Sequence, residues 1–592
     1  MTMSKSIPAR LALLATQSET SPALINSQGT IWTRAQLQHQ MSALVALFMD
    51  AGIQPGDRIA TAAIGGITAA WAFLGTACYA TAVPLNVRLG KHDLDCVFAD
   101  LKPAALLTNL DVDNSVSVAA VKFGVRVLKL PDLAISASTD HENRWTPHAS
   151  PADTALVLHT SGTTSAPKRV ALTHTHLLAS VENIRAAIDL QPEDRCLNPM
   201  PLFHSHGLVA GLLAPLLTGG SVVLPDAFTA SEFLGLLAHL RPTWYTAVPA
   251  MHQAIVHAFE NRRDQAVDHA LRLIRSASAP LPPSVMEQLE RHFKVPVIET
   301  YGMTEATNQI TSNLLPPRVR KQGSAGTPIG MELKIIDSHG CSQLPNVTGE
   351  VAIRGDSVVA EYENDPEATA NAFSDGWLRT GDTGYVDADG YVYLVGRGKE
   401  LINRGGEKIS PRAVEAALLK HPAVAETTAF AVPHPTLGED LAAVVVLCPG
   451  STESEQAFRL HLFDHVADHM VPSRILILDA LPKGPTHKPV RIGLAELLQD
   501  QLTTDYTPPA TPFECKLAEI WSNVLDTTGV GREDDFFLVG GDSLSAIRVI
   551  SRVRRAFGID ASLEELSQLP VLKDQAALLL RHALDGTLRS SS

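Results

Sequence analysis

The chain has 592 residues, enough for three domains or more, and 63 acidic residues against 48 Lys and Arg give it a formal net charge of −15. A chain this acidic is unsuited to general nucleic-acid binding, which needs basic side chains to neutralise phosphates, and a hydrophobic fraction of 45% excludes global disorder. The 6 cysteines show no CxxC spacing, which argues against a disulfide framework or zinc site and suits a reducing cytoplasm. No run of about 18 apolar residues occurs, so we expect no membrane span.

The middle of the chain alternates short apolar runs with amphipathic segments. The apolar runs predict strands at 154–158, 221–224, 243–248, 271–275 and 296–300, and the amphipathic segments predict helices at 207–217, 250–259 and 284–293. Strands that are separated by helices in this way favour an α/β fold with parallel strands.

Composition changes at two further places, and these predict the domain organisation. A polar, Gly-rich segment occupies 396–408, and the Thr- and Pro-rich stretch TTDYTPPATP has the composition of a linker. Helical periodicity follows it, for example at 514–525 and 544–557. We therefore predict a large body, a small mobile α+β lobe, a linker and a helical domain, at 1–395, 396–500, 503–511 and 512–585.

A loop rich in hydroxyl groups, HTSGTTSAPK, follows the predicted strand at 154–158. Hydroxyl groups, a flexible glycine and a lysine together favour an anion-binding concavity. The residues that supply these groups are Thr160, Ser161, Gly162, Thr163, Thr164 and Lys168. The pattern is not a Walker A loop, and taken alone the segment is also compatible with an ordinary polar loop.

Four segments stand in an order typical of the adenylate-forming enzymes: HTSGTTSAPKRVALTH, ETYGMTEATNQ, WLRTGDTGYVDADGYVYLVGRGKELINRGGEKISP and LPKGPTHKPVR. Over roughly 10–495 the chain resembles this family, which includes acyl-CoA synthetases and the adenylation domains of nonribosomal peptide synthetases. The resemblance implies an α/β body with parallel-rich sheets and a small α+β C-terminal lobe. It also implies two half-reactions: a carboxylate attacks ATP to give acyl-AMP and pyrophosphate, and a thiol then displaces AMP to give a thioester.

The resemblance assigns roles around ATP. The loop from Thr160 to Lys168 would hold the phosphates, Thr160 would also be catalytic, and Thr304 would contact phosphate. Glu305 would be catalytic and would coordinate Mg²⁺, a hard cation that prefers carboxylate and phosphate oxygens. The Asp382 carboxylate offers two acceptor oxygens to two adjacent ribose hydroxyls. The full set implied for adenine and ribose is Ala279, Pro280, Tyr301, Asp382 and Arg397.

The lobe carries three further roles by resemblance. Lys488 fits the family's adenylation lysine, whose ammonium would lower the repulsion between the acid's carboxylate and the polyphosphate, although His487 stands where the family usually has Gly. Lys399 matches the hinge about which the lobe would move between half-reactions. Gly405 and Gly406 would let a pantetheine arm pass close to the backbone.

The segment FFLVGGDSLSAIRV resembles the attachment motif of phosphopantetheine-binding carriers. The resemblance implies a four-helix carrier domain in which Ser543 bears 4′-phosphopantetheine, added by a phosphopantetheinyl transferase. Ser543 is expected to open a helix, where N-terminal amides favour a phosphodiester. The alternative is a plain helix N-cap, a role that Ser also favours.

The sequence indicates the identity of the acid substrate less clearly than it indicates the ATP site. Amino-acid-selecting relatives usually place an aspartate in the segment that here reads PLFHSHG, which has no carboxylate. A buried α-ammonium would therefore lack a counter-charge, and we expect an acid without an α-amino group, with His204 as a pocket gate. A structural role is equally open for His204 and His206. The body also resembles the oxalate–CoA ligase branch, but Asn308 replaces that branch's histidine, which argues against oxalate itself. Asn308 is nevertheless expected in the acyl pocket, where its amide is able to hydrogen-bond a polar or uncharged acid.

Together these features predict a cytoplasmic adenylation–thiolation didomain that uses ATP and Mg²⁺. It would load a carboxylic acid onto its own carrier for downstream enzymes that act in trans. Two alternatives stay open: a CoA ligase that releases the acyl-CoA of a small acid, and a non-catalytic carrier and docking protein.

Overall fold

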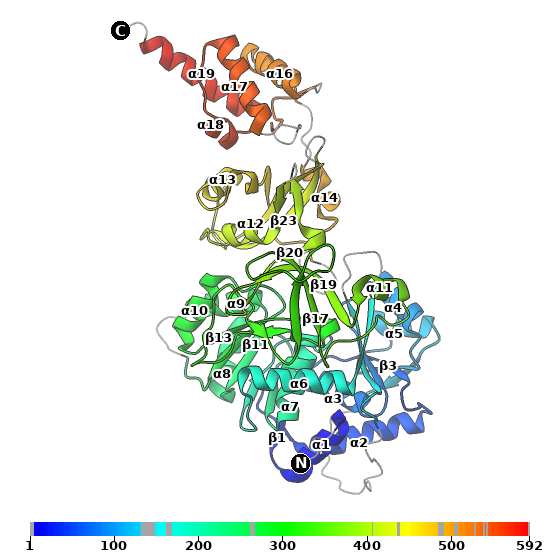
Figure 1. Ribbon diagram of the computed structural model, residues 1–592. Helices are drawn as coiled ribbons and strands as arrows, with labels where there is room; N and C mark the ends of the chain where they lie inside the picture. The colour runs from blue at the N-terminus through cyan, green and yellow to red at the C-terminus, as the bar shows by residue number, and fades with distance from the viewer. Residues whose placement is uncertain are drawn as a thin grey trace. The chain divides into compact units, whose positions relative to one another are not determined.

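The computed structural model describes residues 5–131, 149–160, 168–260, 267–404, 407–434, 438–483, 490–502, 507–525, 529–536, 539 and 543–589. The chain divides into two compact units, Met1–Leu394 and Val395–Ser592. The division falls within strand β20 (Val392–Arg397). Below, the first unit is called the body, and the second contains the lobe (395–502) and the carrier (507–589) (Figure 1).

Two parallel-rich sheets shape the body. The larger sheet has the order β15 (Thr327–Pro328), β14 (Thr311–Ser312), β13 (Val297–Tyr301), β12 (Leu273–Ser276), β11 (Trp244–Ala247), β9 (Arg195–Leu197), β10 (Ser221–Leu224), β1 (Pro22–Asn26) and β2 (Ile31–Thr33). The smaller sheet has the order β6 (Arg126–Lys129), β5 (Ala105–Thr108), β3 (Arg58–Ala62), β4 (Thr81–Pro84), β7 (Thr154–Thr160) and β8 (Lys168–Thr173). The pairings from β13 through to β1 are parallel, so the predicted α/β fold with parallel strands is confirmed.

Helices lie between the two sheets and cover their outer faces (Figure 1). The central layer contains α3 (Gly66–Ala77), α6 (His174–Ile188), π-helix η1 (His206–Leu213) and α7 (Ala214–Thr218), and α1 (Ile7–Gln17) and α2 (Arg34–Asp50) pack against the same core. The larger sheet is covered by α8 (Ala230–Leu240), α9 (Pro249–Glu260) and α10 (Pro283–Phe293), and the smaller by α4 (Lys91–Leu101) and α5 (Ser115–Lys122). The sequence of α3, GITAAWAFLGTA, has no charged residue because both of its faces are buried.

The helix predicted at 207–217 begins instead as the π-helix η1 and continues as α7. Asn198, which follows β9, donates from Nδ2 to the carbonyl of Gly207 at 3.0 Å. A Cβ on Gly211 would lie 2.4 Å from the same Asn198 side chain. This contact comes from a neighbouring strand, so local periodicity could not indicate the wider helix.

An antiparallel sheet, which the sequence analysis did not predict, completes the body. It has the order β16 (Glu332–Ile336), β17 (Gly349–Arg354), β19 (Trp377–Val386) and β18 (Phe373–Ser374), with β20 paired to β19 and α11 (Pro366–Ala372) before β18. This sheet has its own apolar cluster, which includes Tyr301, Ile353 and Leu378.

The lobe is a small α+β unit. Its sheet has the order β22 (Glu407–Ile409), β21 (Ile402–Arg404), β24 (Gly438–Leu447) and β23 (Val424–His434), with β25 (Arg474–Ile477) paired to β24. Its helices are η3 (Gly398–Glu400), α12 (Pro411–Leu418), α13 (Glu455–Phe463), η4 (Asp468–Met470), α14 (Leu494–Leu497) and α15 (Gln499–Leu502). Val414, Ala417 and Leu418 on α12 are buried at the helical spacing of three and four.

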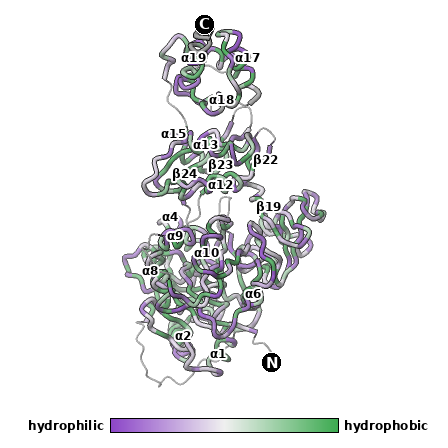
Figure 2. Tube along the Cα trace, turned by 90° about the vertical axis from the view of Figure 1, so that its left-hand side faces the viewer, coloured by the Kyte–Doolittle hydropathy of each residue, from purple (hydrophilic) through white to green (hydrophobic). Residues whose placement is uncertain are grey.

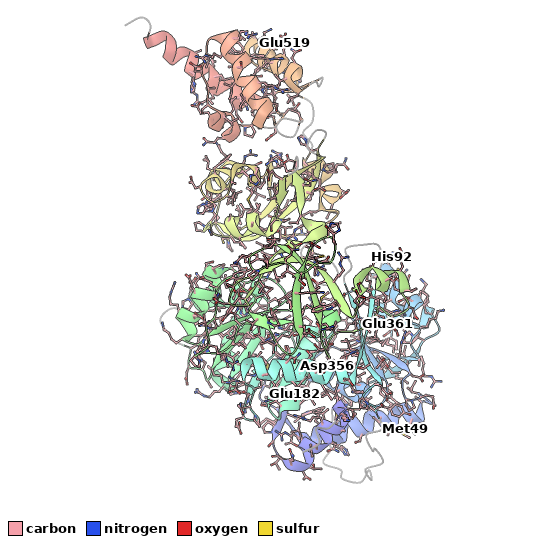
Figure 3. All side chains as sticks on the ribbon, viewed as in Figure 1. Met49, His92, Glu182, Asp356, Glu361 and Glu519 are labelled. Atoms are coloured by element: carbon pink, nitrogen blue, oxygen red, sulfur yellow. The ribbon has the colours of Figure 1, made fainter. Side chains whose placement is uncertain are left out.

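The carrier is helical, with α16 (Pro512–Leu525), α17 (Ser543–Phe557), α18 (Leu563–Gln568) and α19 (Leu572–Arg589) around one apolar cluster. Leu517 and Trp521 on α16 are buried, whereas Glu519 lies on the exposed side of that helix (Figure 3). Hydrophobic and hydrophilic residues likewise alternate along α17 (Figure 2). In the described part of the chain every helix is too short or too polar to cross a lipid bilayer.

Candidate functional site

The predicted phosphate loop connects two adjacent strands. β7 and β8 pair antiparallel, with Thr160 opposite Lys168. The side chain of Thr160 and all of Ser161, Gly162, Thr163 and Thr164 lie outside the described residues. At the other end of the loop the Lys168 ammonium lies 4.3 Å from the ring centroid of Tyr362.

Tyr362 links this lysine to the predicted magnesium ligand. Its hydroxyl donates to Oε1 of the buried Glu305 at 2.9 Å. The next residue, Glu363, donates its backbone N–H to the carbonyl of Arg169 at 3.0 Å, which ties the segment to β8. The structure therefore brings Lys168 and Glu305 together through Tyr362. Sequence reasoning missed this tyrosine, because nothing in the local sequence VVAEYEN marks it as functional.

Tyr301 and Asp382, the two strongest candidates for adenine and ribose contacts, meet directly. Tyr301 is the last residue of β13, and its hydroxyl donates to Oδ2 of Asp382 at 2.5 Å. Asp382 is on β19, and its backbone N–H donates to the Thr380 hydroxyl at 3.1 Å. Both side chains of the pair are buried.

The remaining candidates of this group lie in other elements of the chain. Arg397 ends β20 and is half-buried, Ala279 and Pro280 are exposed in the segment after β12, and Thr304 opens the short 3₁₀ helix η2 (Thr304–Ala306). Next to Tyr301, a Cβ on Gly302 would lie 1.4 Å from the carbonyl oxygen of Asn308. The tight turn after β13 therefore requires glycine at this position.

A chain of buried polar side chains, called the arginine network below, runs from η1 across the ends of β11 and β12 to the turn after β13. It consists of His206, Thr246, Arg275, Asn308 and Gln309. The imidazole of His206 hydrogen-bonds through Nε2 to the Thr246 hydroxyl at 2.6 Å and through Nδ1 to the hydroxyl of Ser278 at 3.0 Å. Arg275 donates from Nη1 to the Thr246 hydroxyl at 3.2 Å, and from Nη2 to Oδ1 of Asn308 at 3.3 Å and to Oε1 of Gln309 at 3.2 Å.

The network contains Asn308, a predicted acyl-pocket residue, but not His204. His204 is half-buried, and its ring centroid lies 4.4 Å from that of Phe203. Sequence reasoning missed Thr246, Arg275 and Gln309. The signal that could have raised attention is the charged residue in the otherwise apolar strand LRLIRS.

Electrostatically, Arg275 is an unusual member of the core. Its side chain is fully buried, and burial lowers the pKa of its guanidinium to about 10, against an opposing influence of Cys196. Burial raises the pKa of the Cys196 thiol well above its usual range, so this neighbour is neutral at neutral pH. The partners of Arg275 in the described part of the chain are all neutral, and Nε has none there. The nearby carboxylate of Glu299 is on the opposite face of the sheet, since Glu299 pairs in register with Ser276. Burial raises the pKa of Glu299 to about 7, against the opposing hydrogen bond from the Leu281 N–H.

The predicted catalytic parts of the lobe are only partly described. Lys488, Gly405 and Gly406 lie outside the described residues, and Lys399 is in η3 with its side chain outside them. Arg491 follows Lys488 by three residues and pairs with Glu400, the neighbour of Lys399.

Arg491 has two further partners. Its Nη2 lies 2.7 Å from Oε1 of Glu415, and its Nε donates to the Ala429 carbonyl at 2.9 Å. Burial lowers the pKa of Arg491, but the carboxylates of Glu415 and Glu400 outweigh it and raise the pKa overall. The segment after Lys488 is therefore tied to the residue next to the predicted hinge.

In the carrier, Ser543 is the first residue of α17, and its side chain lies outside the described residues. Among the residues that the structure describes, no three His, Cys, Asp or Glu side chains gather closely enough to hold a metal ion.

Comparisons with known proteins identify matching families along most of the chain. Residues 13–363 match the AMP-binding enzyme family, residues 413–488 match the AMP-binding enzyme C-terminal domain, and residues 515–579 match the phosphopantetheine attachment site family.

Two curated relatives and one solved structure illustrate the similarity. The oxalate–CoA ligase of Arabidopsis thaliana is 41% identical over 457 residues, which cover 75% of this chain and 88% of that protein. The sulfoacetate–CoA ligase of Cupriavidus necator is 36% identical over 498 residues, which cover 82% and 97%. The crystal structure of ATP-bound MatB from Rhodopseudomonas palustris superposes with a TM-score of 0.76 at 27% identity, covering 84% of this chain and 100% of that one.

The family match spans more than half of the chain, and the carrier match lies in the same polypeptide. Both agree with the resemblance and with the enzyme class expected from the motifs. The chain belongs to the AMP-binding enzyme family and is an AMP-forming acid–thiol ligase that activates acids with ATP and carries a phosphopantetheine-binding domain.

Proposed function

We propose that the protein activates a carboxylic acid without an α-amino group as acyl-AMP, and then loads the acyl group onto the phosphopantetheine thiol of its own carrier. The observation that carries this proposal is the convergence of Lys168, Glu305, Tyr301 and Asp382 in a body that is covalently joined to a carrier. These four residues come from three separate segments, and each has a chemical use in holding ATP.

In the first half-reaction, Lys168 and the loop that precedes it bind the phosphates of ATP. The Asp382 carboxylate accepts hydrogen bonds from the ribose hydroxyls and is held in place by the Tyr301 hydroxyl. Glu305, oriented by Tyr362, is the carboxylate available to Mg²⁺, and the bound ion would neutralise phosphate charge. Lys488 supplies the ammonium that stabilises the charge that develops as the acid attacks the α-phosphate.

In the second half-reaction, the lobe moves about the hinge at Lys399 and withdraws Lys488. The loop with Gly405 and Gly406 then approaches the acyl-AMP, and the thiol of the arm on Ser543 displaces AMP. A phosphopantetheinyl transferase is required to install that arm, and the linker at 503–511 lets the carrier domain (512–585) reach the body. Enzymes acting in trans then use the loaded acyl group.

The choice of a non-amino acid follows from charge. PLFHSHG offers no carboxylate to an α-ammonium, and the arginine network places a guanidinium, not an acid, near the carboxyl end of β12. A cationic amino group would have no counter-charge there and would be repelled by Arg275.

The test compares acceptors. Holo-protein is given ATP, an acid that supports pyrophosphate exchange, and free CoA, and acyl-carrier is measured by intact mass spectrometry beside acyl-CoA by chromatography. Because tethering raises the effective concentration of the arm to roughly the millimolar range, acyl-carrier should dominate. Ser543→Ala should abolish covalent loading and leave acid-dependent pyrophosphate exchange unchanged.

A second candidate function is a CoA ligase that releases acyl-CoA, which the names of the two curated relatives favour. It predicts that acyl-CoA dominates in the wild type and that Ser543→Ala changes nothing measurable, a result that would refute loading in cis. Absence of pyrophosphate exchange with every acid would instead indicate a non-catalytic carrier and docking protein.

A further inference from the structure

Arg275 has a buried charge that no described residue neutralises. It is fully buried, and with a pKa of about 10 its guanidinium stays protonated at neutral pH. Removing a guanidinium from water without an opposite charge costs several kcal/mol. Thr246, Asn308 and Gln309 accept its hydrogen bonds but supply no negative charge, and its Nε has no partner among the described residues.

The position of Arg275 is that of a ligand-binding residue. It lies near the carboxyl end of β12, in register with Thr246 on β11, and ligands of open α/β sheets bind beyond the carboxyl ends of the strands. Its partners Asn308 and Gln309 follow the turn after β13, where the N–H of Ile310 donates to the carbonyl of Tyr301 at 2.8 Å. The network is thus joined through the backbone to the residue that contacts Asp382.

The hydrogen bonds of Arg275 hold the guanidinium in a defined orientation. The His206 imidazole fixes the Thr246 hydroxyl from the other side, and the two amide side chains hold Nη2. A planar guanidinium fixed in this way is suited to a carboxylate or sulfonate, whose oxygens it can pair with in a directed, charge-assisted manner.

We infer that Arg275 receives a second anionic group of the substrate, so that the acid activated is a short one bearing a further carboxylate or sulfonate beside the carboxylate that reacts. This inference rests on the proposed acid-activating function. Arg275 on β12 then supplies the positive charge that a histidine at position 308 would carry, and Asn308 orients the guanidinium. Oxalate and sulfoacetate, for which two relatives are named, are both acids of this kind.

The first experiment uses wild-type holo-protein and matched pairs of acids. Each pair differs only in the charge of the second group: oxalate and oxamate, malonate and malonamate, sulfoacetate and methylsulfonylacetate. Acid-dependent pyrophosphate exchange gives kcat/KM for each acid. A buried charged receptor discriminates strongly against a neutral analogue, so in at least one pair we expect the dianion to be preferred by about a hundredfold or more. The pair with the largest ratio identifies carboxylate or sulfonate.

The second experiment removes the charge. Arg275→Gln keeps an amide donor for Asn308, and we expect it to lower kcat/KM for the dianion about a hundredfold while the neutral partner changes only a few-fold. A purely structural role would lower both acids alike. Arg275→Lys should retain part of the preference. Arg241→Gln, at a half-exposed ion pair with Asp268, is the matched control, and AMP binding reports an intact nucleotide site.

The outcomes separate this inference from the proposed function. If the wild type uses the neutral and dianionic acids of every pair equally well, or only monoacids, Arg275 is not an anion receptor, although the acid-activating function stands. If no acid supports exchange in a protein that binds AMP, the proposed function itself fails. Should Arg275→Gln lose AMP binding, the wild-type ratios alone decide.

Discussion

Two arginines with limited access to water, the fully buried Arg275 in the body and the half-buried Arg491 in the lobe, have opposite surroundings. Arg491 lies between the carboxylates of Glu400 and Glu415, which raise the pKa of its guanidinium. Arg275 has neutral partners in the described residues, and burial lowers its pKa to about 10. The side chain of Arg491 is 18% exposed, and Arg275 is 0% exposed, so the arginine with less access to water is the one without a counter-charge.

This difference distinguishes a structural cation from a binding one. A cation that stabilises a fold has its counter-charge in the same chain, because the folded state must be stable before any ligand binds. A cation that receives an anionic substrate is left uncompensated until the substrate binds. Electrostatic strain of this kind is typical of functional sites.

Replacing Arg491 should produce the largest effect. Arg491→Gln leaves the half-buried carboxylates of Glu400 and Glu415 without their shared cation. Removing one partner of a largely desolvated ion pair costs about 3–5 kcal/mol. We expect the opening free energy of the lobe amides in β23 and β24 to fall by that amount, as measured by hydrogen–deuterium exchange of the full chain. Amides of the body should be unaffected.

Arg474→Gln provides the control for this measurement. Arg474 pairs with the single carboxylate of Glu455 at 3.3 Å, and that pair is more exposed. Its loss should cost no more than about 1 kcal/mol. Equal effects of the two substitutions would show that the ion pairs of Arg491 contribute no more than an ordinary surface ion pair. Arg491 would then not be a structural cation.

The sequence predicted the strands around the proposed nucleotide site well, for a physical reason. Strands such as 221–224 and 296–300 are short apolar runs buried on both faces, and the structure places β10 and β13 at Ser221–Leu224 and Val297–Tyr301. The resemblance to the adenylate-forming enzymes predicts Tyr301, Glu305 and Asp382 as site residues, because the motifs that contain them stand in the family's order. The antiparallel sheet β16–β20 was not predicted. Burial alternates along the first half of β19, but two of the buried residues there, Thr380 and Asp382, are polar, so the hydropathy does not alternate with the burial.

The arginine network could not be predicted in the same way. Thr246, Arg275 and Asn308 come from three segments, and none of them belongs to a pattern of its own. They become one group only because β11 and β12 pair in register and the turn after β13 folds back. The sequence alone argues against oxalate, because Asn308 stands where a histidine is expected. It does not reveal that Arg275 of β12 hydrogen-bonds to Asn308.

A second uncompensated charge, Glu299, sharpens the comparison, because it can become neutral by binding a proton. Its pKa rises from 4.5 to about 7 in the folded state. Between these pH values the folded state binds more protons than the unfolded state, so stability falls as pH rises and stays low above about pH 7. The full effect is roughly 3 kcal/mol. Arg275, with a pKa of about 10, stays protonated near neutral pH and therefore keeps its charge.

The measurement is the difference in unfolding free energy between Glu299→Gln and wild type, from hydrogen exchange of β12 and β13 amides. This difference should be small near pH 5 and should favour the variant by roughly 3 kcal/mol near pH 8. Glu287→Gln, at an exposed carboxylate of the preceding helix, controls for loss of a charge. A difference that is the same at both pH values would show that Glu299 is not a proton-binding group in this range.

Replacing Arg275 should have the smallest effect on the unliganded protein. Arg275→Gln removes a buried charge, which is favourable. It also removes hydrogen-bond donors from the side-chain oxygens of Asn308 and Gln309, which is unfavourable. These contributions oppose each other, so the unfolding free energy of the body without ligand should change by about 1 kcal/mol or less. Hydrogen exchange of β11 and β12 amides tests this. A loss as large as that expected for Arg491→Gln would mean that Arg275 is a structural cation, and the distinction between the two arginines would disappear.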